Sequence, residues 1–197
     1  FLTVPVDGNG KDLPLILNPH GGPFGVQDVW RFNAETQFFA NQGYAVMQVN
    51  FRGSGGYGKR YERIGYKRWG LEMQDDLTDA VQWAVSEGIA DPDHVCIYGA
   101  SYGGYATMAG LTFTPDLYAA GINFVGVVDL ELLQEGSNRN SRRFNGFYDE
   151  LRLEWGDPDD PNDRQYIIES SPLRQANNIK SPVLIIHGAQ DNNVKLE

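Results

Sequence analysis

Five consecutive residues combine a nucleophile with the backbone freedom needed to expose it. Gly99-Ala100-Ser101-Tyr102-Gly103 follows an apolar run that predicts a strand and precedes a run that predicts a helix. In so tight a turn a side chain at either glycine would collide with the adjoining strand or helix, and the serine hydroxyl projects above the sheet edge. The pattern predicts a nucleophile elbow centred on Ser101, with an ordinary glycine-rich turn as the alternative.

A second glycine-rich segment lies upstream, after another apolar run. Its sequence is His20-Gly21-Gly22-Pro23. Attack on a carbonyl carbon places negative charge on the carbonyl oxygen, and N–H donors fixed in advance lower that barrier by roughly a few kcal/mol each. We expect the backbone N–H of Tyr102 as one donor and the loop of His20, Gly21 and Gly22 as the source of the other. Taken alone, the segment is equally typical of a turn closed by proline.

Short apolar runs alternate with longer helical patterns, which is typical of β-α-β units around a parallel sheet. The expected strands are Leu13–Leu17, Tyr44–Val49, His94–Tyr98, Ala119–Val125 and Val183–His187. The expected helices are Ala34–Asn41, Gln74–Glu87, Tyr102–Leu111 and Phe144–Trp155. The loop Gly136–Arg143 and the acidic, turn-rich segment Asp157–Asp163 interrupt this pattern. We interpret the region between the last two strands as an insertion that decorates the sheet.

The composition bounds the fold and the class of partner. The 197 residues are 41% hydrophobic, which suits one domain with one core. Sixteen basic and 26 acidic side chains give a net charge of −10, which disfavours nucleic acid and anionic membrane surfaces. No apolar run reaches the roughly 20 residues of a membrane span. The one cysteine, Cys96, excludes an internal disulfide and a multi-cysteine metal site, so we expect a soluble protein and favour the cytoplasm.

The order of the motifs along nearly the whole chain resembles the catalytic domain of the prolyl oligopeptidase family. The matching segments are His20–Pro23, Asn50–Gly58, Gln74–Asp76, Asp91–Val95, Gly99–Tyr105, Ser171–Leu173 and Ile186–Asp191. The H-G-G-P and R-G-S-x-G-Y-G forms are most similar to the acylaminoacyl-peptidase and dipeptidyl-aminopeptidase branch. The resemblance implies an α/β-hydrolase fold, a mostly parallel sheet with helices on both faces.

The resemblance also implies an activity. It is that of a serine peptidase that hydrolyses short peptides through an acyl-enzyme, with no cofactor and no metal. The family combines this domain with a β-propeller, which residues 1–197 lack, so we expect the propeller as a partner and allow for a homo-oligomer. A carboxylesterase and a non-catalytic binding module of the same fold are the alternatives.

The resemblance assigns the acid but leaves the base missing. Asp191 matches the family's acid in the H-G-x-x-D motif, with a solvated turn aspartate as the alternative, and Asp129 ranks second. The histidine base follows the acid in this fold, yet no histidine follows Asp191. We therefore expect a truncated piece of a longer protein, with the histidine in a C-terminal segment and little peptidase activity in this chain. Leu196-Glu197 is also typical of a cloning scar.

The three histidines within the chain are poor substitutes for that base. His20 belongs to the oxyanion loop, His94 starts the strand before the elbow, and His187 ends a strand near Asp191. We interpret His187 as structural, with an improvised base as the alternative.

Apolar candidates for the substrate pocket are Phe24, Val127 and Leu133, each with plain core as the alternative. The resemblance implies that the ring of Tyr102 also lines the substrate cleft.

Two charged features receive structural interpretations. Arg52 lies in a glycine-rich loop that lacks a phosphate-binding pattern, so we expect an ion pair with Asp75 or Asp76. The carboxylates Asp157, Asp159, Asp160 and Asp163 do not have calcium-loop spacing because prolines interrupt them, and a solvated turn is expected.

Overall fold

A computed structural model describes residues 1–6, 9–134, 145–191 and 193–194, and these residues contain one mixed sheet. Within them, the strand order is β1-β3-β2-β4-β5-β6. β1 pairs antiparallel with β3, and the other neighbouring strands are parallel. The strands are β1 (Leu2–Thr3), β2 (Leu13–Leu17), β3 (Ala45–Met47), β4 (Ala90–Ala100), β5 (Ala120–Phe124) and β6 (Val183–Ile186). The predicted mostly parallel α/β architecture is confirmed.

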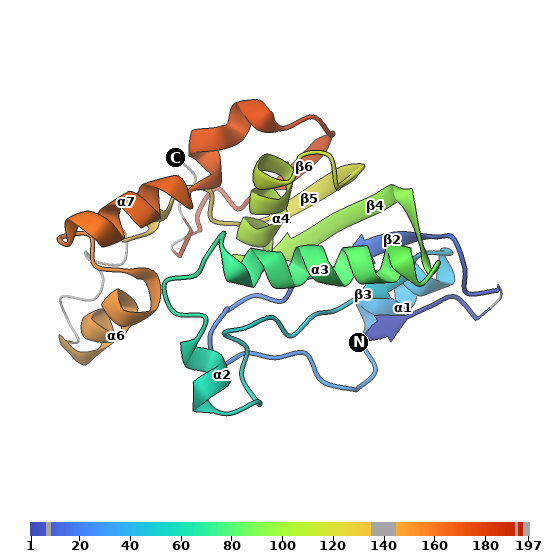
Figure 1. Ribbon diagram of the computed structural model, residues 1–197, viewed down its shortest axis with the longest axis horizontal. Helices are drawn as coiled ribbons and strands as arrows, with labels where there is room; N and C mark the ends of the chain where they lie inside the picture. Colours follow the sequence, from blue (N-terminus) through green and yellow to red (C-terminus); the bar gives the residue numbers. More distant parts are fainter. Residues whose placement is uncertain (7–8, 135–144, 192, 195–197) are drawn as a thin grey trace.

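Helices cover both faces of this sheet, with α3 and α4 on one side and α1 on the other (Figure 1). The helices are α1 (Ala34–Asn41), α2 (Lys59–Arg63), α3 (Glu72–Ser86), α4 (Tyr102–Phe113), α6 (Asn145–Trp155), α7 (Pro161–Glu169) and the 3-10 helix η1 (Pro172–Asn178). None of the helices in the described part of the chain is long and apolar enough to cross a bilayer.

The periodicity of α3 explains how the helix docks. Met73, Leu77, Val81 and Ala84 recur at helical spacing and are fully buried. They join the buried strand residues in one core cluster. The α3 helix thereby lies against β4 and α4, the two elements that flank Ser101.

Helix α4 is buried on nearly every side, unlike α3. It contacts β4 and β5 and is covered by η1. Its small residues, including Gly103, Gly104 and Ala106, let the helix approach the sheet closely. This close approach places the start of α4 at the carboxyl end of β4.

The predicted strands are confirmed, with ends shifted by up to four residues, but the acidic segment differs from its prediction. Asp157–Asp163 was expected to be a turn-rich, solvated segment, whereas α7 begins within it at Pro161. The Asp160 side chain accepts the N–H groups of Asn162 and Asp163, and proline suits the first helical turn. Helices α2 and η1 also escaped prediction. The predicted loop Gly136–Arg143 and residues Phe144, Asn192 and Leu196-Glu197 lie outside the described residues.

The remaining carboxylates of the acidic segment pair with cations. Asp163 lies 2.6 Å from Lys67 Nζ and accepts the Asp157 N–H. Arg152 bridges Asp157 and Asp159. Each carboxylate thus has a local partner, in agreement with a structural role.

The predicted ion pair of Arg52 is confirmed with Asp76. Its guanidinium donates to both carboxylate oxygens at 2.9 and 2.5 Å, and its backbone N–H donates at 2.8 Å. Three bonds therefore join the loop after β3 to helix α3.

We predict that Gly104→Ala destabilises the fold by about 1–3 kcal/mol, because overpacking a tight backbone contact costs that much. The added methyl would lie 2.6 Å from Asn123 Oδ1 and from Gly126 Cα. Gly188→Ala is the control, since it meets nothing within 4 Å and should change stability by less than about 0.5 kcal/mol. Urea denaturation of both variants measures the difference, and equal stability would contradict the packing argument.

Candidate active site

Ser101 occupies a strained turn between β4 and α4. Its φ of 57° and ψ of −118° lie in a region that non-glycine residues seldom adopt. The Ser101 N–H donates to Phe124 O at 3.0 Å, and the Ser101 carbonyl accepts the Tyr105 N–H at 3.0 Å. The residue is exposed, and within the described part of the chain nothing hydrogen-bonds to its hydroxyl. The predicted strand-to-helix turn is therefore present, with an accessible hydroxyl at its tip.

The two flanking glycines are required for the reason that their spacing predicts. A Cβ on Gly99 would lie 2.4 Å from the backbone of Gly103. A Cβ on Gly103 would lie 2.2 Å from Pro19 O, in the segment that leads into the His20 loop. Real Cβ atoms do not approach backbone this closely, so only glycine permits the contacts.

The predicted oxyanion loop lies against the serine. A methyl group at Gly21 would be 3.6 Å from Ser101 Cβ and 3.3 Å from Ala100 O. Gly22 has a φ of 117°, a value that favours glycine. The N–H groups of Gly21 and Gly22 bond to no other residue that the structure describes. Tyr102 is the first residue of α4, so its N–H has no partner within the helix.

His20 joins this loop to a neighbouring turn. Its Nδ1 lies 2.7 Å from Gly21 O, and its Nε2 lies 2.8 Å from Ser54 Oγ. The ring stacks on Phe51 with centroids 4.4 Å apart. Burial is the main cause that lowers the pKa of His20, opposed by its bond to Gly21 O and by the charge of Asp28. The imidazole is therefore neutral at neutral pH.

Asp191 lies in the turn that follows β6. Its Oδ1 accepts the N–H groups of Asn193 at 2.8 Å and Val194 at 3.0 Å. The bond from Val194 and then the bond from Asn193 lower the pKa of Asp191 and favour the ionised form of this partly exposed carboxylate. Its Oδ2 accepts no hydrogen bond from the described residues. An oxygen thus remains for a further donor.

The register of three strands relates Asp191 to Ser101. Ala100 pairs with Phe124, and Phe124 pairs with Ile186, so the carboxyl ends of β4, β5 and β6 are level. Two strand spacings separate the end of β4 from the end of β6 by about 10 Å. The proposed nucleophile and the proposed acid therefore follow strands that end at the same side of the sheet, with β5 between them.

The other two histidines are engaged away from Ser101. His94 Nδ1 lies 2.7 Å from Asp91 Oδ2. His187 Nε2 donates to Val194 O at 2.7 Å and closes the turn that carries Asp191. This bond agrees with the structural interpretation of His187.

Asp129, the second acid candidate, is also engaged. It is 6% exposed, and its Oδ1 accepts the N–H groups of Glu131 and Leu132 at the start of a helical stretch, residues 130–134. Its Oδ2 lies 3.2 Å from Arg174 Nη2. Asp129 therefore acts as a helix cap with an ion pair.

The four pocket candidates belong to the core or pack on it. The Tyr102 ring is 1% exposed, between Phe51, Trp69 and Tyr105, rather than in an open cleft as expected. Helix α4 is buried on nearly every side, so a ring on its first residue packs into this aromatic cluster. Val127 is buried in the core cluster, and Phe24 and Leu133 pack against that cluster.

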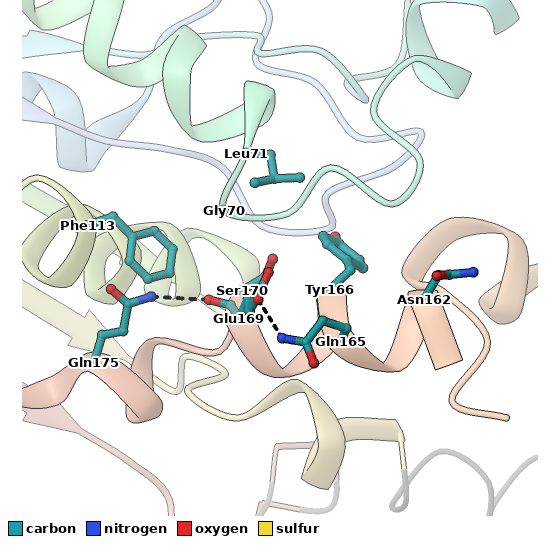
Figure 2. A pocket seen from close by; sticks show the side chains of 9 residues that line it. All are labelled: Gly70, Leu71, Phe113, Asn162, Gln165, Tyr166, Glu169, Ser170 and Gln175. Atoms are coloured by element: carbon teal, nitrogen blue, oxygen red, sulfur yellow. Dashed lines mark hydrogen bonds between the residues drawn. The ribbon is translucent and has the colours of Figure 1, made fainter. Parts of the chain in front are cut away.

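A cavity of about 430 Å³ lies away from the elbow, beside the carboxyl end of α4 (Figure 2). Its lining residues are Gly70, Leu71, Phe113, Asn162, Gln165, Tyr166, Glu169, Ser170 and Gln175. Phe113 ends the helix that Ser101 precedes, and twelve helical residues span about 18 Å. The cavity is thus distinct from the predicted site. Among the described residues, no group of three or more His, Cys, Asp or Glu side chains is arranged to hold a metal ion.

Comparison with known proteins agrees with this geometry. The profile of the prolyl oligopeptidase family matches residues 30–197. The chain belongs to the prolyl oligopeptidase family. Dipeptidyl aminopeptidase BIII of Pseudoxanthomonas mexicana is 43% identical over 202 residues, covering 99% of this chain and 29% of that protein.

Solved structures of this family share the fold. The acylaminoacyl peptidase of Pyrococcus horikoshii is 32% identical, with a TM-score of 0.84 over 99% of this chain and 30% of the other. A puromycin-hydrolyzing peptidase of Mycobacterium tuberculosis is 31% identical, with a TM-score of 0.86 over 98% of this chain and 29% of the other. The chain thus spans less than a third of the length of these relatives.

Two residues beside the site escaped prediction as site residues. Ser54 lies within the Asn50–Gly58 segment, and its bond to His20 has no sequence signal beyond that motif. Val125 follows β5 with a φ of 48°, which a β-branched residue rarely adopts. Its N–H donates to Ile186 O at 2.8 Å, and the preceding Phe124 O accepts the Ser101 N–H at 3.0 Å. The end of β5 thus joins β6 to the turn of Ser101.

We predict that the Asp191 carboxyl titrates below the ordinary aspartate value of about 3.9. Val194→Pro removes one of the two N–H donors and should raise this pKa. The carboxylate contributes stability above the unfolded pKa and loses it as the pH falls through the lower folded value. Carbon-13 NMR titration measures both midpoints, and an unshifted Asp191 in the unaltered chain would contradict the assignment of these bonds.

Proposed function

We propose that this chain is the catalytic domain of a serine peptidase that hydrolyses short peptides through an acyl-enzyme. The observation that carries the proposal is the placement of Gly21 against Ser101. A methyl group added at Gly21 would lie 3.6 Å from Ser101 Cβ. An exposed, strained hydroxyl beside free backbone N–H groups is the arrangement that acyl transfer requires.

The proposed reaction has two steps. Ser101 Oγ forms a bond to the peptide carbonyl carbon while its proton passes to a histidine base. The N–H groups of Tyr102 and of the Gly21–Gly22 loop, with His20 beside them, stabilise the oxyanion. The C–N bond then breaks, and the base returns the proton to the leaving amine. Water next attacks the ester by the same route and releases the acid and the free serine.

Asp191 would orient the base, which we place in a polypeptide segment outside the 197 residues. The exposed edge strand supports this placement, because Leu184, Ile185 and Ile186 of β6 are 54%, 56% and 44% exposed. An uncovered apolar edge strand is uncommon in a finished fold. The greater length of the relatives leaves room for such a segment and for the propeller that the resemblance implies.

The names of the relatives support a substrate class. They include a dipeptidyl aminopeptidase and an acylaminoacyl peptidase, and these names describe removal of short N-terminal units. We therefore propose short peptides as substrates of the whole protein. Phe24 and Leu133, which are partly exposed, remain the proposed lining for the residue before the cut bond, whereas the burial of Val127 favours its core alternative.

Hydrolysis assays of the full-length protein test the function. We expect turnover of an aminoacyl-anilide as well as of an aryl ester, and loss by at least about 10³-fold in Ser101→Ala. Ser86→Ala, on the exposed end of α3, is the matched control and should retain activity. Turnover of the ester alone would favour a carboxylesterase, and turnover of neither would favour a binding module.

Labelling by a fluorophosphonate tests the missing base. We expect Ser101 to react in the full-length protein and to react about 10²-fold or more slowly in the 197-residue chain, since a general base contributes at least that factor. The rates are read from intact-protein mass spectrometry. Equal rates would refute the proposal that an outside histidine activates Ser101.

A further inference from the structure

Ser54 is a buried hydroxyl beside the site with no role in the proposed reaction. The residue is 0% exposed, and its Oγ lies 2.8 Å from His20 Nε2. Its backbone N–H donates to Phe51 O at 3.0 Å, within the turn of residues 51–54. Water does not reach this hydroxyl, so its bond to the imidazole meets no solvent competition.

The direction of the two His20 bonds follows from their partners. Gly21 O can only accept, so His20 Nδ1 carries the proton and donates at 2.7 Å. The neutral ring has one N–H, and therefore Nε2 accepts the proton of Ser54 Oγ. Burial lowers the pKa of His20 and so preserves this neutral form. The ring stacks on Phe51 at an interplanar angle of 19°, which limits its rotation.

The bond to Gly21 O also determines where the next N–H points. Gly21 C=O and Gly22 N–H belong to one planar peptide unit, so a bond that holds the carbonyl holds the N–H as well. Neither glycine has a side chain that could restrain this peptide, and glycine has the widest backbone freedom. An outside restraint is therefore needed for a loop that must present a fixed donor.

The turn that carries Ser54 is itself attached to the core. Arg52 binds Asp76 of α3 through three hydrogen bonds, and Gly55 N–H donates to Val26 O at 2.8 Å. The Ser54 hydroxyl is thus held by elements outside the oxyanion loop. A continuous series of contacts runs from α3 through Ser54 and His20 to Gly21.

We propose that Ser54 is a positioning residue that, through His20, fixes the Gly21–Gly22 peptide beside Ser101. This inference rests on the proposed function, in which that peptide stabilises the oxyanion. The oxyanion exists only near the transition state, so a loosened peptide lowers kcat and leaves KM almost unchanged.

Kinetics of the full-length protein form the first test. Ser54→Ala should lower kcat on an aminoacyl-anilide at least tenfold and leave KM within twofold. It should also weaken the binding of a peptide boronate inhibitor by a factor similar to that for kcat. Thr112→Val is the matched control, since it deletes another buried hydroxyl at the far end of α4 and should change none of these values. An unchanged kcat, a loss confined to KM, or an equal loss in Thr112→Val would overturn the proposal.

A second variant covers the case in which Ser54→Ala fails to fold. His20→Asn retains an N–H near the Nδ1 position but has no group at the position of Nε2, so it breaks the link to Ser54. Its kcat should fall at least as far, with a Tm that shows a folded protein. Full activity in His20→Asn would overturn the proposal.

NMR separates this inference from the proposed function. In the 197-residue chain, Ser54→Ala should shift the Nε2 resonance of His20 and the amide resonances of Gly21 and Gly22, whereas Thr112→Val should not. If these resonances shift but the full-length protein has no hydrolase activity, the link from Ser54 to the Gly21–Gly22 peptide is supported and the catalytic proposal is refuted. Unchanged Gly21 and Gly22 amides would refute the positioning link itself.

Discussion

Close contact between backbone segments around Ser101 is the constraint on which the rest of the site depends. Gly99 meets Gly103, Gly103 meets the carbonyl of Pro19, and Gly104 meets Gly126, all at distances that exclude a Cβ. These contacts bring the ends of β2, β4 and β5 together at one edge. The serine can then sit at a strained φ of 57° because both neighbouring segments hold its backbone.

The surrounding charges are arranged so that few carboxylates remain unengaged near this edge. Asp76 binds Arg52, and Asp129 caps a helix and pairs with Arg174. Asp191 differs, because both backbone N–H groups bind Oδ1 and its other oxygen accepts no bond from the described residues. Hydrogen bonds favour the ionised form of this partly exposed carboxylate, a state suited to orienting a cationic imidazole.

The site therefore divides into two parts with different physical origins. The proposed nucleophile is a side-chain hydroxyl and the proposed oxyanion donors are backbone N–H groups, and both depend on the close backbone contacts at the turn of Ser101. The proposed acid lies on a turn after β6, a strand with three exposed apolar side chains. Under the proposed function, the segment that carries the histidine base would also cover β6, which would couple folding of that segment to activation of Ser101.

The sequence alone determined the α/β alternation, the strand-to-helix turn at Ser101 and the pairing of Arg52 with an aspartate, because each follows from local patterns: apolar periodicity, glycine spacing and charge. Helix α7 was missed because its acidic start resembles a turn until Asp160 is seen to cap it. Only the tertiary structure decided that the Tyr102 ring lies in the core, that Asp129 is engaged, and that Ser54 reaches His20. Those outcomes depend on which distant segments meet at the sheet edge, and no spacing along the chain encodes such contacts.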